Sequence, residues 1–141
     1  MKKEFVPFEI ALNLKKLGFN EPCIAFYFVG SLNIREFKNS KNVNSAFYNS
    51  LVCSAPSFHH VFRWFRNEYQ WQANIEATSE QQDHRLGYNY FIWNYKTGEQ
   101  YDCTPTPKDR PVGDFEYDIY EDAEIACLNK LIELTSKSES V

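Results

Sequence analysis

The fold is decided by residues 54–69, which read SAPSFHHVFRWFRNEY. Ser54 at the N-cap position and Pro56 in the first turn predict the start of a helix. Aromatic side chains then recur at helical spacing, and we expect this stripe to face the core: Phe58, Phe62, Phe65 and Tyr69. The stretch therefore predicts a helix that ends near Tyr69.

Two further helices are predicted on either side of this stretch. Residues 7–17 place apolar side chains on one helical face, and Gly18 suits the left-handed position that ends a helix. The last helix opens on Asp118 and Glu121, which have the spacing of a capping box. We expect residues 136–141 to form a frayed polar tail. The apolar stripe of this helix consists of Ala123, Cys127, Leu131 and Leu134.

Short runs rich in aromatic and β-branched residues predict the strands. They cover residues 23–29, 32–37, 72–78, 86–96 and 99–103, whereas residues 104–113 carry three prolines and must be irregular. The pattern predicts a single α+β domain over residues 1–135, with an antiparallel sheet of about four to five strands and three helices. Its C-terminal part has the α-β-β-β-α order of a double-stranded-RNA-binding domain.

The composition is that of an ordinary globular chain. Of the 141 residues, 43% are hydrophobic and 24% are charged, and no apolar run approaches the roughly 20 residues of a membrane span. The N-terminus lacks the apolar stretch and the cleavage site of a signal peptide. We therefore expect a cytoplasmic protein that does not bind a membrane.

Recognisable catalytic and metal-binding motifs are missing from the sequence. The five glycines do not cluster into a phosphate-binding loop, and the four cysteines form no CxxC pair. Adjacent His59 and His60 would point about 100° apart on a helix, which does not suit one metal ion. A nucleophilic pair of Cys53 and His59 is conceivable, but nothing orients it. We predict buried free thiols and a non-enzymatic protein without catalytic residues, cofactor or metal.

Charge is distributed unevenly along the chain. Residues 1–70 hold nine Lys/Arg against five Asp/Glu, a net of +4, whereas residues 71–141 hold six against fourteen, a net of −8. Part of the acidic excess complements the N-terminus of the last helix, which favours negative charge. The functional interpretation is a patch that binds a basic partner surface. The patch consists of Asp114, Glu116, Asp118, Glu121, Asp122 and Glu124.

The helix within residues 54–69 also carries a basic face, formed by His59, Arg63 and Arg66. Such a face is either simply solvated or a contact for the phosphates of RNA. A double-stranded-RNA-binding domain places basic residues at the start of its last helix, where this chain has Glu121 and Asp122. These carboxylates would repel a phosphate backbone. We therefore expect the topology of that class without its usual mode of RNA binding.

Several stretches carry a resemblance to known proteins. Together they resemble a widespread group of small uncharacterised proteins carried by bacteriophages and mobile elements of gut-type bacteria. Their motifs are caps and core stripes, so the resemblance transfers no catalytic residue. It implies a setting in which small acidic phage proteins bind a host machine, inhibitors of CRISPR effectors being one such class. The stretches are residues 4–12, 17–23, 54–56, 62–66, 120–123, 126–128 and 131–132.

The leading hypothesis is a non-enzymatic binding protein that inhibits or modulates a host nucleic-acid-processing complex, in its most specific form an anti-CRISPR protein. Its partner would be a host effector protein or ribonucleoprotein with a basic surface. One alternative is an RNA-binding module that uses Arg63 and Arg66. The other is a small enzyme with an unrecognised site, against which the scarcity of His and Gly argues.

Overall fold

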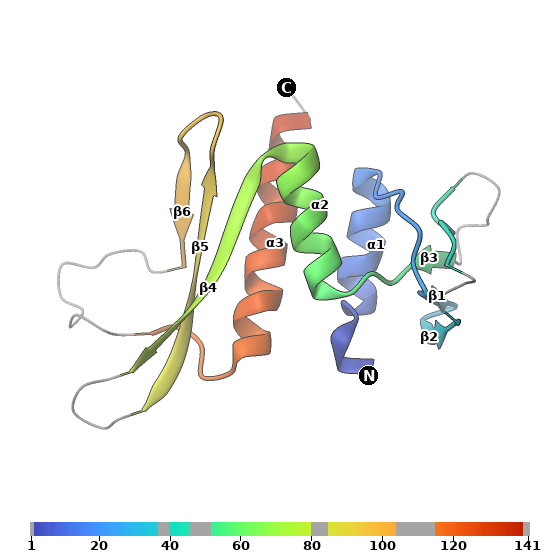
Figure 1. Ribbon diagram of the computed structural model, residues 1–141, viewed down its shortest axis with the longest axis horizontal. Helices are drawn as coiled ribbons and strands as arrows, with labels where there is room; N and C mark the ends of the chain where they lie inside the picture. Colours follow the sequence, from blue (N-terminus) through green and yellow to red (C-terminus); the bar gives the residue numbers. More distant parts are fainter. Residues whose placement is uncertain (1, 37–39, 46–51, 80–84, 104–114, 140–141) are drawn as a thin grey trace. The chain divides into compact units, whose positions relative to one another are not determined.

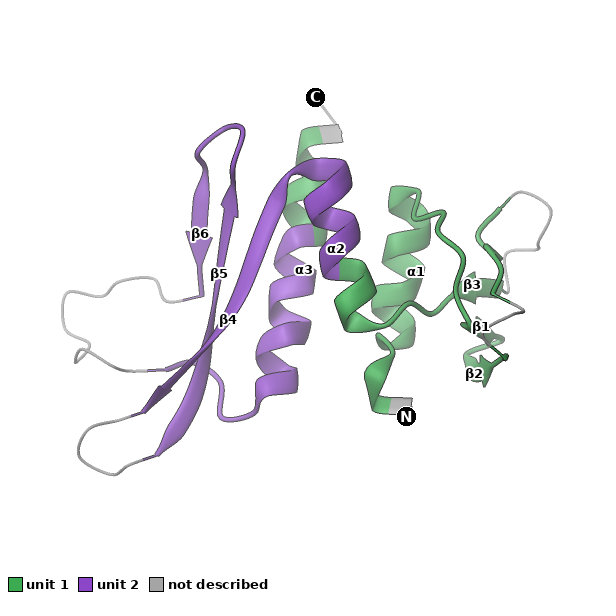
Figure 2. Cartoon of the chain, in the orientation of Figure 1, with its two compact units in different colours: residues 1–61, 132–141 green, residues 62–131 purple. Residues whose placement is uncertain are grey.

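The computed structural model describes residues 2–36, 40–45, 52–79, 85–103 and 115–139. These residues form three α-helices, a short 3₁₀ helix and six strands (Figure 1). The strands make two three-stranded antiparallel sheets, with the orders β2-β1-β3 and β4-β5-β6. The chain divides into two compact units, residues 1–61 with 132–141 and residues 62–131 (Figure 2).

The predicted α+β class with three helices is confirmed, but the prediction of one sheet of four to five strands is wrong. Strand β1 (Ala25–Phe28) pairs with β2 (Ser31–Ile34) along one edge. Its other edge pairs with β3 (Val52–Ser54), a strand that the sequence did not indicate. Both edges of β1 are thus occupied within the first unit, and the later strands pair with one another in a second sheet.

The first unit begins with the 3₁₀ helix η1 (Lys2–Glu4) and with α1 (Phe8–Leu17), which confirms the first predicted helix. Gly18 ends α1 with a φ of 93°, in the left-handed region. The backbone N–H of Gly18 donates to the carbonyl of Lys15 (3.1 Å), and that of Phe19 donates to the carbonyl of Leu14 (2.9 Å). These two bonds satisfy carbonyls that the helix end would otherwise leave free.

The start of α2 (Phe58–Tyr69) differs from the prediction that Ser54 is its N-cap. Ser54 is fully buried in β3, opposite Phe26. Ser57 takes the cap position, because its Oγ accepts a hydrogen bond of 3.2 Å from the backbone N–H of His60. The sequence offers two serines before the helix, and the pairing of residues 52–54 with β1 decides between them.

The buried face of α2 is also rotated from the predicted stripe. Phe65 is fully buried as expected, but its buried neighbours are Val61 and Trp64. The other members of the predicted stripe are half-buried, namely Phe58, Phe62 and Tyr69. The observed spacing, i, i+3 and i+4, is that of an ordinary amphipathic helix.

The second unit contains a long antiparallel ladder between β4 (Trp71–Ser79) and β5 (Leu86–Asn94). The register runs from Trp71 opposite Asn94 to Ser79 opposite Leu86. Strand β6 (Gln100–Asp102) pairs with the other edge of β5, so β5 is the central strand of this sheet and β4 is an edge strand. Along β5, buried side chains alternate with half-exposed ones, which gives the sheet an inner and an outer face.

The last helix, α3 (Tyr120–Glu139), has the predicted apolar stripe but different ends. It begins two residues after Asp118, so Ile119 rather than Asp118 occupies the cap position. It runs four residues beyond the predicted end at residue 135. The hydroxyls of Ser136 and Ser138 donate to the carbonyls of Ile132 and Thr135, at 2.7 and 3.0 Å, and thereby fit these polar residues into the helix.

The hairpin between β1 and β2 turns on two residues with positive φ, Val29 (50°) and Gly30 (78°). Positive φ at both positions is the signature of a type I′ turn, which prefers Asn-Gly. A β-branched residue is strained in this conformation. Val29 is 63% exposed, so burial does little to offset the strain.

We expect Val29→Asn to raise the free energy of unfolding by about 1 kcal/mol, because Asn adopts positive φ more easily and little apolar surface is lost. Urea unfolding followed by circular dichroism measures the change. Ile34→Asn is the matched control, since Ile34 is also an exposed β-branched residue but lies outside the positive-φ region. An unfolding free energy of Val29→Asn at or below that of the parent would contradict the strain.

Candidate functional site

The predicted acidic patch lies at the start of α3, in the second unit. We call the described carboxylates of residues 116–124 the acidic surface: Glu116, Asp118, Glu121, Asp122 and Glu124. All of them are exposed except Glu124, which is half-buried. The sixth predicted member, Asp114, lies outside the described residues.

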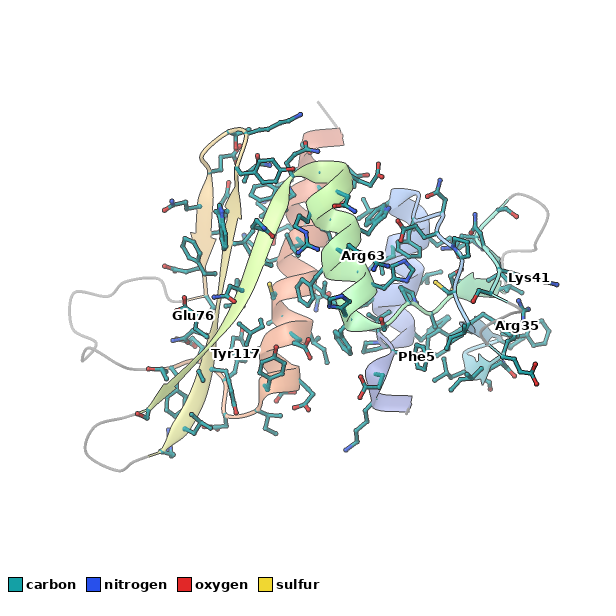
Figure 3. The ribbon with its side chains drawn as sticks, viewed as in Figure 1. Phe5, Arg35, Lys41, Arg63, Glu76 and Tyr117 are labelled. Atoms are coloured by element: carbon teal, nitrogen blue, oxygen red, sulfur yellow. The ribbon has the colours of Figure 1, made fainter. Side chains whose placement is uncertain are left out.

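The segment that precedes α3 is fixed to strand β5 by backbone pairing. The N–H of Tyr88 donates to the carbonyl of Tyr117 (2.8 Å), and the N–H of Tyr117 donates to the carbonyl of Tyr88 (3.1 Å). The ring of Tyr117, labelled in Figure 3, stacks on that of Tyr90 at a centroid distance of 6.3 Å. Asn89 Oδ1 accepts a 2.9 Å hydrogen bond from the N–H of Glu116. The acidic surface is therefore held on the sheet rather than on a free loop.

Phe115 makes a second attachment, because its ring lies directly over Gly87. A Cβ at position 87 would collide with the Phe115 ring, so a side chain is excluded there. The Arg85 guanidinium carbon lies 4.9 Å from the centroid of the same ring. Arg85 Nη2 also lies 3.9 Å from Asp118 Oδ1, in an exposed ion pair that contributes little to stability.

Exposed apolar side chains lie among the carboxylates. Leu86 and Ile119 are each 53% exposed, and Tyr120 is 43% exposed. The Tyr120 ring stands edge-on to Tyr88 with a centroid distance of 5.4 Å. Burial, and then the carboxylates of Glu124 and Glu121, raise the pKa of the Tyr120 hydroxyl above its ordinary value. The surface thus combines negative charge with an apolar centre, a composition suited to a protein partner.

The predicted basic face lies on α2, where Arg63, labelled in Figure 3, and His59 are exposed and Arg66 is half-buried. The division between the two units falls between Val61 and Phe62. His59 therefore belongs to the first unit, whereas Arg63 and Arg66 belong to the second.

Three of the four cysteines are buried as predicted, namely Cys23, Cys53 and Cys127, whereas the prediction is wrong for Cys103, which is half-buried. Cys53 is 2% exposed, and burial raises the pKa of its thiol, while His59 lies on the exposed face of α2. Burial, followed by the Glu21 carboxylate, raises the pKa of Cys23 from 9.0 to about 12. Burial also raises the pKa of Cys127. Among the residues that the structure describes, no group of three or more His, Cys, Asp and Glu could hold a metal ion.

Two further features were not predicted from the sequence. His60 Nε2 contacts the Glu21 carboxylate, and the His60 ring stands edge-on to the buried Phe19 at 5.4 Å. The partners in the first contact are 39 residues apart, and no local pattern relates them. The second feature is the exposed apolar group beside the acidic surface. Its only signal in the sequence is that Ile119 and Tyr120 interrupt the run of carboxylates.

We expect iodoacetamide at pH 8 to leave Cys23, Cys53 and Cys127 unmodified in the folded protein and to modify all three in urea. At a pKa of about 12, only about one Cys23 thiol in ten thousand is ionised at this pH. Mass spectrometry of tryptic peptides measures the modification. Rapid reaction of Cys53 in the folded protein would contradict its burial and would favour the enzymatic alternative.

The raised pKa of Cys23 also determines the direction in which the stability of the fold changes with pH. The folded pKa of Cys23 lies above the unfolded value of 9.0, so the thiol stabilises the fold fully below about pH 9. This contribution is lost as the pH rises toward 12.

We expect Gly87→Ala to lower the free energy of unfolding by about 1–3 kcal/mol, because the added methyl group meets the Phe115 ring. The backbone at Gly87 lies outside the left-handed region, so the ring alone excludes the methyl group. The control is the same substitution in a Phe115→Ala background. In the Phe115→Ala background, Gly87→Ala should lower the free energy of unfolding very little. An equal loss of unfolding free energy in both backgrounds would show that the ring does not lie over Gly87.

Comparison of the chain with family models, with curated proteins and with solved structures gives no match. The resemblance to proteins of phages and mobile elements therefore stays a prediction. No helix in the described part of the chain has both the length and the apolar character needed to cross a membrane. The acidic surface and the basic face of α2 are therefore the features from which a function can be inferred.

Proposed function

We propose that this protein is a non-enzymatic binding protein whose acidic surface contacts a basic surface of a host nucleic-acid-processing complex and inhibits or modulates it. The observation that carries the proposal is the grouping of exposed carboxylates around Ile119 and Tyr120, on a segment fixed to β5. The most specific form of the proposal is an anti-CRISPR protein, and that form rests on the resemblance of the sequence.

The helix dipole accounts for part of the acidic surface. Glu121 and Asp122 lie in the first turn of α3, where a carboxylate stabilises a helix by roughly 0.3–1 kcal/mol. The dipole acts within the first turn, and Glu116 and Asp118 lie before it. These two carboxylates therefore add to the local field beyond what the helix requires, as a surface that attracts a basic partner would.

The exposed apolar side chains at the centre of the acidic surface indicate that it binds a protein, and that its carboxylates do not serve only to repel other acidic molecules. Charged rims set the rate and specificity of association, whereas buried apolar and aromatic groups supply most of the binding free energy. Tyr120 and Ile119 are exposed and adjacent, and each is flanked by a carboxylate. A basic protein surface with an apolar pocket would match both the carboxylates and the exposed apolar side chains.

RNA binding through α2 is the alternative, and the observation in its favour is the exposure of Arg63. Against it, the same unit exposes Glu121 and Asp122, which repel phosphates. RNA binding by Arg63 would be steeply dependent on salt and would be abolished by Arg63→Glu.

We expect the double substitution Glu121→Lys with Asp122→Lys to reduce capture of the partner on the order of tenfold or more, because two of the five carboxylates of the acidic surface are replaced by positive charges. Tagged protein is incubated with bacterial host lysate, with and without nuclease, and the captured proteins are quantified by mass spectrometry. The control is Glu4→Lys with Glu9→Lys. It makes the same change in charge in the first turns of η1 and α1, where both carboxylates are exposed.

Capture that resists nuclease, survives in the control and is lost in the test variant is the expected result. Equal capture by the two variants would show that the acidic surface does not bind the partner. Partners that vanish on nuclease treatment and on Arg63→Glu would support the RNA-binding alternative instead.

A further inference from the structure

The sheet of the second unit has an outer face that differs in chemistry from its inner face. The inner face lies toward α3, because Lys130 Nζ lies 5.4 Å from the centroid of Tyr101 and Tyr120 packs on Tyr88. Side chains alternate between the faces along each strand, so the register defines the members of the outer face. They include Gln72, Asn74 and Glu76 on β4, Asn89, Phe91 and Trp93 on β5, and Gln100 and Asp102 on β6.

Phe91 and Trp93 form an aromatic pair in the middle of this face. Their ring centroids are 5.4 Å apart, with 32° between the ring planes. Both side chains are half-buried, whereas the other two tryptophans, Trp64 and Trp71, are only 3% and 7% exposed. The pair therefore keeps part of its aromatic surface available to a ligand.

Carboxylates stand next to this pair. Asp102 on β6 lies directly opposite Phe91, and side chains in such positions have Cβ atoms about 4.5–5.5 Å apart. Glu76, labelled on β4 in Figure 3, is diagonal to Phe91, a separation of about 7–8 Å. Both carboxylates are exposed. The members of the outer face on either side of Trp93, Gln72 and Gln100, are amides.

A guanidinium group fits this combination. Its planar face is attracted to aromatic rings within about 6 Å, and its N–H groups pair with carboxylates. The chain itself makes this kind of contact, since Arg35 lies 4.1 Å from the centroid of Phe26. Bases of single-stranded nucleic acid also stack on aromatic sheet faces, but Glu76 and Asp102 would repel the phosphates that connect them.

We propose that the outer face of β4-β5-β6 is a binding site for arginine side chains of an extended basic peptide segment, held by Phe91, Trp93, Asp102 and Glu76. None of these residues belongs to the acidic surface at the start of α3. The site goes beyond the proposed function because it names a second contact and the side chain that it recognises.

The test is a titration of the full-length protein with an acetylated and amidated hexaarginine peptide. Trp93 is the half-exposed tryptophan, so its fluorescence should change, and the amide resonances of residues 91, 93 and 102 should shift in NMR spectra. Hexalysine should bind several-fold more weakly, because an ammonium group stacks and pairs less well than a guanidinium. Trp93→Phe should remove the fluorescence change while the peptide still binds.

Asp102→Asn with Glu76→Gln removes the two charges with little change in shape and should weaken hexaarginine binding by about tenfold. Asp118→Asn with Glu121→Gln is the matched control on the acidic surface and should change the Trp93 response less than twofold. Equal effects of the two variants, or shifts confined to residues 116–124, would overturn the proposal. Tighter binding of a single-stranded oligouridylate than of hexaarginine would overturn it as well.

The two proposals fail separately. If the Glu121→Lys and Asp122→Lys variant captures the host partner like the parent protein, the proposed function fails. The Trp93 response to hexaarginine then still decides whether the outer face binds arginine.

Discussion

The ladder between β4 and β5 is the constraint on which the second unit depends. Nine residue pairs fix which side chains face α3 and which face outward. A slip by one residue would move Tyr90 and Ile92 out of the core and bring Phe91 and Trp93 into it. The same ladder sets the position of Gly87 under Phe115 and of Asn89 beside Glu116, so the attachment of the acidic surface follows from the register.

Asn94 anchors the end of this ladder. Its buried side chain donates to the carbonyl of Tyr69 (3.1 Å) and accepts from the N–H groups of Lys96 (3.0 Å) and Thr97 (3.1 Å). One amide thereby joins the end of α2 to the turn before β6. A buried polar group with several partners specifies a single geometry, because any displaced arrangement would leave some of these groups without hydrogen bonds.

The sequence predicted elements whose signals are local. Gly18 marked the end of α1, and the aromatic run after Leu86 marked β5. It did not predict β3, because three residues are too few for a periodic signal and the nearby serine and proline suggested a helix start. The division into two sheets depends on pairings between distant residues, such as Phe26 with Ser54. Composition revealed the carboxylates of the candidate site, but not the exposed Leu86 beside them or the contact of Phe115 with Gly87.

The position of β4 at the edge of its sheet affects how the protein behaves at high concentration. A nine-residue edge strand offers backbone N–H and C=O groups to a strand of another molecule. Its sequence, WQANIEATS, contains no proline, and Glu76 is its one charged residue. When two copies meet edge to edge along β4, their Glu76 carboxylates approach and repel each other. This single side chain near the middle of the strand thus opposes edge-to-edge pairing of two copies of the sheet.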